Sequence, residues 1–333
     1  MSQPELLVLR ALKLGDLLVA VPALRGLRRA FPEHRIRYAA QGWLRPIVDL
    51  VGGIELLDTH GLDVPVPLPS GVVDIAVNLH GSGPESRHRL DALQPRRRIG
   101  HRWDGGDGPR WDGPEWVHGL HERERWTRLV NWHGVAADPA DLLLLPPPVP
   151  SPRPGAVVVH PGAAYGSRHW PVDRFATVAA ALSHAGIDVV LTGSAGERDR
   201  ALAVAEAARL GEEAVLAGRL DLAGMAAVVA ESTAVVSADT GAAHLASAYR
   251  RPSVVLFGPA PVSEWGPPAG PHRALTDEAL RRGDTFASDP DPALLAVQPL
   301  DVLLALGDLG VLRSRTQAAV RSPGPGAATP QFG

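Results

Sequence analysis

Residues 234–249, AVVSADTGAAHLASAY, decide the fold of this chain. They begin with the apolar run Ala234–Ala238, which is short and apolar enough to be a strand buried on both faces. The polar residues Asp239 and Thr240 end that run, and Gly241–Tyr249 then has the length and composition of a helix. A buried strand that passes through such a turn into a helix is the repeating unit of a parallel α/β sheet.

The same alternation recurs on both sides of this unit. The further strands predicted are Leu6–Ala11, Arg35–Ala40, Val72–Leu79, Ala156–His160, Asp188–Thr192 and Ser253–Phe257, and the further helices are Leu17–Phe31, Leu120–Gly134, Val172–Ala185, Glu197–Leu210 and Leu222–Glu231. Pro22 is expected to kink the first helix or to mark a late start. Between Gly81 and Pro114 the pattern degrades into Gly, Pro, Arg and Trp, which predicts loops over a groove.

A proline-rich segment divides the chain. Residues 145–155, LPPPVPSPRPG, carry six prolines without periodicity, which is typical of a stiff extended linker. We therefore expect two Rossmann-like, doubly wound parallel-sheet domains, residues 1–148 and 155–313, that face each other across a cleft. Residues 314–333 lack apolar periodicity and are expected to form a disordered tail.

Composition excludes several classes of function. The chain has 333 residues, 33 of them basic and 36 acidic, so it lacks the broad positive charge of a nucleic-acid-binding protein. It has no cysteine, which excludes disulfides, thiolate metal sites and a cysteine nucleophile. No run approaches the roughly 20 apolar residues of a spanning helix, and charged residues interrupt the apolar N-terminal stretch. We expect a cytoplasmic protein, with peripheral contact at the inner face of the plasma membrane left open.

Ligands of open parallel sheets bind beyond the carboxyl ends of the strands, so the loops there are the candidate sites. Lys13, Gly15 and Asp16 follow the first predicted strand. Asp16 either caps the next helix or lies at the floor of the cleft, where its carboxylate could take a proton from a substrate hydroxyl. Lys13, the only lysine in the chain, could pair with Asp16 or contact an anionic ligand.

Two loops of the second half offer groups for an anionic ligand. The first contains His160, Gly162, Ser167 and Arg168; its glycine lets the backbone approach a ligand, and Arg168 could present a forked positive charge to phosphate. Trp170-Pro171 is expected to start the following helix. The second loop contains Thr192, Gly193, Ser194 and Glu197. Ser194 and Glu197 match a capping box, and the alternative is that Glu197 accepts hydrogen bonds from ribose hydroxyls.

The loop Asp239–His244, DTGAAH, carries the strongest signal for a ligand. The free amides and the positive dipole end of the helix that begins at Gly241 favour a phosphate. Thr240 adds a hydroxyl donor, Ala242 lies in the first turn, and His244 lies about one turn along the helix. A purely structural cap is the alternative. Phe257-Gly258-Pro259 closes the same edge of the sheet.

Together these segments resemble glycosyltransferase family 9, which includes the ADP-heptose:lipopolysaccharide heptosyltransferases. The resemblance spans about residues 6–268 and rests on the motifs LGD (14–16), HPGA (160–163), SRxWP (167–171), DTGxxH (239–244) and FGP (257–259). It implies a GT-B fold and inverting, metal-independent transfer of a heptose-like sugar, with no cofactor. The implied donor is a nucleotide-diphosphate sugar, most simply ADP-linked, in the C-terminal domain. The implied acceptor is a glycolipid or polysaccharide hydroxyl in the N-terminal domain.

The resemblance also implies roles for individual residues. Asp16 matches the general base of the family, Arg168 a contact to donor phosphate, and Glu197 a ribose contact. Residues 239–242 match the loop for the donor sugar and phosphate. Two departures stand out: Arg168 replaces a usual lysine, and Ala260-Pro261 stand where relatives often have threonine.

Other assignments remain open or are disfavoured. Asp289-Pro290-Asp291 has the letters of a metal-binding DxD motif, but it lies in a proline-rich loop with no apolar strand before it. His118 and His121 could share a helical face, but nothing nearby completes a ligand set, so no metal site is expected. A UDP- or GDP-sugar transferase, an epimerase, and a non-catalytic nucleotide-sugar-binding protein remain alternatives. The acceptor, the transferred sugar and the nucleobase are left open by the residues alone.

Overall fold

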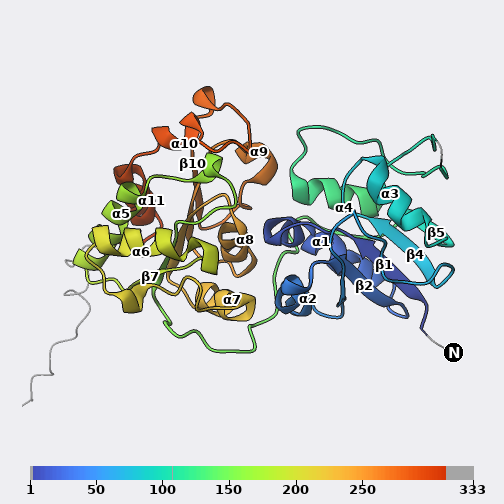
Figure 1. Cartoon of the computed structure of the whole chain (residues 1–333), viewed down its shortest axis with the longest axis horizontal. Coiled ribbons are helices and arrows are strands. Elements are labelled where there is room, and N and C mark those ends of the chain that lie inside the picture. Colours follow the sequence, from blue (N-terminus) through green and yellow to red (C-terminus); the bar gives the residue numbers. More distant parts are fainter. Residues whose placement is uncertain (1–2, 107, 313–333) are drawn as a thin grey trace, which may run out of the picture.

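The computed structural model describes residues 3–106 and 108–312, and it contains two five-stranded parallel sheets (Figure 1). The first has the order β3-β2-β1-β4-β5, with β1 Glu5–Leu9, β2 Arg35–Ala40, β3 Glu55–Asp58, β4 Val73–Asn78 and β5 Arg97–Ile99. The second has the order β10-β9-β8-β6-β7, with β6 Val157–His160, β7 Val189–Leu191, β8 Ala234–Ala238, β9 Ser253–Leu256 and β10 His272–Leu275. The prediction of two doubly wound parallel sheets is confirmed. The predicted tail, residues 314–333, lies outside the described residues.

Helices alternate with these strands along the chain. Those of the first half are α1 Leu14–Ala30, α2 Arg45–Val51, α3 Pro84–Asp91 and α4 Glu122–Trp132. Those of the second half are α5 Val172–His184, α6 Arg198–Ala207, α7 Leu222–Ala230, α8 Gly241–Ala248, α9 Val262–Trp265, α10 Pro292–Ala296 and α11 Pro299–Asp308. No helix within the described ranges is long and apolar enough to cross a membrane.

The late start predicted for the first helix is wrong. Helix α1 begins at Leu14 and continues through Pro22, which is buried. A proline inside a helix costs one backbone hydrogen bond and strains the preceding turn. Here every residue from Leu17 to Leu24 is buried, so the packing of this helix outweighs that local cost.

The prediction of loops between Gly81 and Pro114 is also wrong in part. Helix α3 and strand β5 both lie in this region, and Trp103 pairs with Trp111 in an isolated antiparallel bridge. Helix α3 has the polar sequence PESRHRLD, and β5 is three residues long at the edge of its sheet. Neither element is long enough to produce the apolar periodicity on which the prediction depended.

The two halves pack against each other through helices rather than sheets. Helix α1 lies against α8, and α2 against α7, as Figure 1 shows for the first pair. One continuous apolar cluster includes Leu6 and Leu24 of the first half together with Val158, Val235 and Leu245 of the second. The domain limits 1–148 and 155–313 stay a prediction. The first sheet lies within the first of these ranges and the second sheet within the other.

Candidate functional site

The candidate site lies where the N-terminal ends of α1 and α8 face each other across the two halves. Each helix directly follows a central strand of its sheet, β1 or β8, so both helices start at carboxyl edges. A Cβ atom at Gly15 would lie 3.0 Å from Cδ2 of His244, and one at Gly241 would lie 2.6 Å from Cδ2 of Leu14. Each glycine therefore makes room for a side chain of the opposite half.

Asp16 is the third residue of α1, and Lys13 is the N-cap, so the alternative of Asp16 as N-cap is wrong. The Oδ2 atom of Asp16 accepts a hydrogen bond from the backbone N–H of Lys13 at 3.2 Å. Its Oδ1 atom lies 3.2 Å from Nη2 of Arg10, and the side chain is 23% exposed. Asp16 thus pairs with Arg10, whereas the exposed Lys13 side chain forms no ion pair among the described residues.

Arg10 is a functional candidate that the sequence did not single out. It ends the apolar run of β1 and is 1% exposed. Its Nε–H donates to the backbone carbonyl of Asp16 at 2.7 Å, and its Nη1 donates to the carbonyl of Leu79. Its Nη2 also lies 3.5 Å from Oε2 of Glu122. A buried arginine needs such partners, and these bring three segments of the first half together.

His80 is a second candidate that the sequence did not single out. It follows β4, and its Nδ1 atom accepts a hydrogen bond from the backbone N–H of Ala11 at 3.2 Å. Burial lowers the pKa of His80, and the charge of Arg10 lowers it further, while Asp16 acts in the opposite direction. Because Nδ1 accepts this hydrogen bond, the neutral ring carries its proton on Nε2.

On the donor side, Asp239 and Arg168 lie at the end of β8 and in the loop after β6. The buried Asp239 places Oδ2 3.7 Å from Nη2 of Arg168 and Oδ1 3.6 Å from Nε2 of His244. Both contacts are longer than hydrogen bonds, so these side chains lie near each other without using their hydrogen-bonding groups on one another. Ala242 is buried in the first turn of α8 and adds no polar side chain.

Two buried polar atoms, one in the loop after β6 and one at the start of α8, lack hydrogen-bond partners among the described residues. In the part of the chain that the structure describes, neither Nε of Arg168 nor Oγ1 of Thr240 has a hydrogen-bond partner. Thr240 is the N-cap of α8, yet its side chain makes no capping bond. An unsatisfied buried donor costs about 1–3 kcal/mol, so both atoms are suited to a ligand that accepts hydrogen bonds.

Glu197 forms the predicted capping box with Ser194, whose backbone N–H donates to Oε2 at 2.7 Å. The other carboxylate oxygen lies over Gly162, where an added Cβ would come within 2.3 Å of Oε1. Burial raises the pKa of Glu197, but the charge of His160 and the bond from Ser194 outweigh it and lower the pKa overall. His160 in turn contacts the hydroxyl of Thr192 at 3.1 Å.

The same cluster contains Gly193. An added Cβ there would lie 3.1 Å from Cβ of Glu197, so the two loops pack closely at this point. The structure therefore brings together His160, Gly162, Thr192, Gly193 and Glu197, all predicted as donor-side candidates.

Other predicted residues serve the loop that follows β10. Ser167 is fully buried, and its hydroxyl donates to the carbonyl of Thr285 at 2.9 Å. An added Cβ at Gly258 would lie 3.2 Å from the carbonyl oxygen of Ser167. The carboxylate of Asp291 accepts from the backbone N–H groups of Arg282, Gly283 and Ala293. Asp291 is thus the N-cap of α10, a role that the sequence analysis did not predict for the DxD letters.

The histidine pair of the sequence does not share a helical face. His118 precedes α4, and His121 is its N-cap. Across the described residues, no cluster of three or more histidine, aspartate and glutamate side chains is arranged to hold a metal ion.

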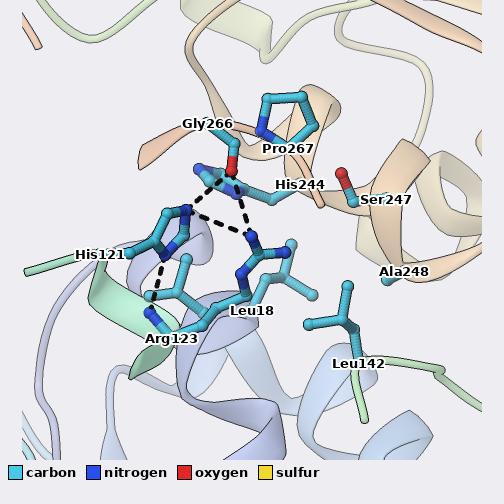
Figure 2. Close-up of a pocket in the computed structure, with 10 residues that line it drawn as sticks. Leu18, His121, Arg123, Leu142, His244, Ser247, Ala248, Gly266 and Pro267 are labelled. Carbon is cyan, nitrogen blue, oxygen red and sulfur yellow. Dashed lines mark hydrogen bonds between the residues drawn. The ribbon is translucent and has the colours of Figure 1, made fainter. Parts of the chain in front are cut away.

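His121 instead joins the two halves beside His244 (Figure 2). Its Nδ1 accepts from the backbone N–H of Arg123 at 3.2 Å, so the neutral ring donates from Nε2 to the carbonyl of Gly266 at 2.9 Å. Burial lowers the pKa of His121, which favours this neutral form. These residues line a cavity of about 10 Å³, which holds one water at most and is too small for a sugar nucleotide.

Residues 136–281 match the sequence model of glycosyltransferase family 9 (heptosyltransferase). Lipopolysaccharide heptosyltransferase 2 of Salmonella typhimurium is 27% identical over an alignment that covers 92% of this chain and 98% of that protein. These matches confirm the resemblance inferred from the motifs, and with it the prediction of a glycosyltransferase.

Two solved structures show the same fold. The glycosyl transferase family 9 protein of Veillonella parvula has a TM-score of 0.74 and 18% identity, over 92% of this chain and 97% of that one. The ADP-heptose LPS heptosyltransferase II of Escherichia coli has a TM-score of 0.72 and 21% identity, over 92% and 98%. The predicted GT-B fold is confirmed.

Proposed function

Because this chain is a heptosyltransferase-like glycosyltransferase of the family 9 type, we propose that it transfers a heptose from ADP-heptose to a hydroxyl of a lipopolysaccharide-core intermediate. The names of its relatives in Salmonella and Escherichia coli supply this donor and this acceptor class. The observation that carries the proposal is that Nε of Arg168, in the loop after β6, and Oγ1 of Thr240, at the start of α8, have no hydrogen-bond partner among the described residues. The proposed role lies in cell-envelope polysaccharide synthesis, where a lipid-linked acceptor would bring the enzyme to the membrane surface.

The donor half would stabilise the leaving group. Arg168 offers a charged fork, Thr240 a hydroxyl, and the first amides of α8 the positive end of a helix dipole. Together these groups would face the diphosphate, whose negative charge grows as the sugar leaves. The free oxygen of Glu197 over Gly162 would accept from a ribose hydroxyl.

The acceptor half would supply the base. Asp16 would take the proton of the acceptor hydroxyl while that oxygen attacks the anomeric carbon from the side opposite the diphosphate. The new glycosidic bond forms as the bond to the diphosphate breaks, the proton ends on Asp16, and the electron pair leaves with ADP. A single displacement of this kind inverts the anomeric configuration.

We further propose that transfer needs no divalent metal, since protein groups supply the positive charge at the diphosphate. The expected result is full transfer activity in excess EDTA, measured by release of ADP at saturating substrates. Reactivation by added Mg²⁺ of an enzyme silenced by EDTA would contradict this proposal.

The nucleotide preference tests the proposed donor. A thermal-shift and calorimetric screen of ADP, GDP and UDP is expected to show the tightest binding for ADP. Thr240→Ala should weaken ADP binding by about 10- to 100-fold, because one hydrogen bond to a charged phosphate is lost. Thr177→Ala is the matched control, since its hydroxyl donates to a carbonyl within α5.

The competing functions predict different results in the same screen. A preference for UDP or GDP would assign the chain to transferases or epimerases that use those sugar nucleotides. Tight ADP-heptose binding without turnover on any acceptor would indicate a non-catalytic binding protein. Unchanged ADP affinity in Thr240→Ala would remove this residue from the phosphate site.

A further inference from the structure

Arg10 contacts the carboxylates of both Asp16 and Glu122, in the half of the molecule that would bind the acceptor. We propose that Arg10 and Glu122 form a positioning pair that aims the Asp16 carboxylate at the acceptor hydroxyl. This inference rests on the proposed role of Asp16 as the base. It concerns residues that would touch neither donor nor acceptor and act through Asp16 alone.

The first argument is that Arg10 holds Asp16 at two points. Its Nε–H donates to the backbone carbonyl of Asp16 at 2.7 Å, and its Nη2 lies 3.2 Å from the carboxylate Oδ1. The guanidinium is planar and rigid, so these two contacts fix the carboxylate relative to its own backbone. The backbone N–H of Lys13 holds the second oxygen at 3.2 Å. A lysine at position 10 would keep the charge but could not reproduce the two-point contact.

The second argument is that Arg10 is itself immobilised. It donates to the carbonyl of Leu79, its guanidinium carbon lies 4.5 Å from the ring centroid of Trp126, and it is 1% exposed. A surface ion pair loses its effect through side-chain freedom and solvent screening, and both are reduced here because Arg10 is buried. The orientation of Arg10 is therefore transmitted to Asp16.

The third argument is the charge balance around Glu122. Its Oε2 lies 3.5 Å from Nη2 of Arg10 and accepts from Nε1 of Trp126 at 2.9 Å, while its Oε1 accepts from Nε of Arg125 at 2.7 Å. Two carboxylates, Asp16 and Glu122, thus share the buried guanidinium between them. Removing the charge of Glu122 would leave Nη2 of Arg10 with a stronger attraction to Asp16 and so change the orientation of the Asp16 carboxylate.

Arg10→Lys tests the proposal in the full chain, with turnover and both KM values as the readouts. The expected result is a loss in kcat of about 10- to 100-fold, since a misplacement near 1 Å can cost that much. The KM values for donor and acceptor should stay within about twofold, because no substrate contact is lost. Arg87→Lys is the matched control: Arg87 is also 1% exposed and lies 4.8 Å over a tryptophan, Trp103, but does not contact Asp16.

A double-mutant cycle separates positioning from a merely structural role. In the Asp16→Asn background, Arg10→Lys should have no further effect on the residual kcat, since the group that it positions is gone. Wild-type kcat in folded Arg10→Lys, or an equal loss in both backgrounds, would overturn the proposal. If Asp16→Asn itself keeps wild-type turnover, the proposed base is wrong, which is a separate outcome.

Glu122→Gln keeps the test decisive if Arg10→Lys does not fold. Glutamine preserves the shape and one acceptor oxygen, so the bond from Trp126 can remain while the charge is lost. The expected result is a loss in kcat of about 3- to 10-fold with unchanged KM values. Wild-type kcat in this variant would count against the role of Glu122 and, where Arg10→Lys is unfolded, against the pair.

Discussion

Asp16→Asn is expected to lower kcat for sugar transfer by about 10²- to 10⁴-fold, the usual contribution of a positioned general base. Asparagine keeps the size of the side chain and one acceptor oxygen, but it cannot take a proton at neutral pH. The ADP affinity should change by less than about twofold, since the donor loops belong to the other half of the molecule. Transfer measured under single-turnover conditions, together with ADP titration, checks both statements.

Asp141→Asn is the matched control for this experiment. Asp141 is in the same half and is 24% exposed, close to the 23% of Asp16, but it pairs with Arg25 and Arg29 on the surface. Its substitution should leave turnover unchanged. Near-wild-type turnover in Asp16→Asn would contradict the assignment of Asp16 as the base, whatever the effect of the substitution on the stability of the protein.

Arg168→Gln is expected to lower kcat/KM by about 10²- to 10³-fold, the effect of removing one preorganised charged donor from a developing anion. Arg168→Lys should lose less, since the charge remains and only the forked geometry changes. The 3.7 Å contact to Asp239 is too long to saturate the guanidinium, so its Nε–H and Nη groups remain available to phosphate.

The control for Arg168 is Arg153→Gln. Arg153 lies at the end of the linker with a side chain 31% exposed, against 24% for Arg168, and pairs with Asp188 of the second half. Its loss should leave ADP binding and turnover unchanged. Equal activity of wild type and Arg168→Gln across donor concentrations would show that phosphate is bound elsewhere.

Eight elements of the second half, β6 to β9 and α5 to α8, were predictable because each has a strong local signal, whereas β10, α9, α10 and α11 were not predicted. The strand Ala234–Ala238 is predicted with both of its ends, and α8 ends one residue before its predicted limit at Tyr249. Apolar runs separated by Gly- and Pro-containing turns specify such elements without any long-range information. Helix α3 was not predicted because its sequence is polar and lacks apolar periodicity; Arg87, within the helix, donates to the carbonyls of Ser82 and Gly83 before it.

The candidate site was predictable only where its residues closely follow the carboxyl ends of strands. Asp16, Arg168 and Thr240 come soon after β1, β6 and β8, where fold geometry alone makes them candidates. Arg10 closes an apolar strand and carries no local signal, since only tertiary contacts reveal that its guanidinium faces Asp16 and Glu122. The sequence analysis named only Lys13 as a possible partner of Asp16, whereas the structure pairs Asp16 with Arg10.

Gly15 and Gly241, at the starts of α1 and α8, allow the N-terminal ends of these two helices to approach each other closely. The gap between the two helix ends is set by missing side chains: His244 occupies the space beside Gly15, and Leu14 the space beside Gly241. An alanine at either position would push the two helix ends apart and weaken catalysis, although no reactive group would be removed. One of the two glycines comes from each half. A chimera that combines one half with the other half of another transferase would therefore keep the distance between the two helix ends only if both parts contributed a glycine.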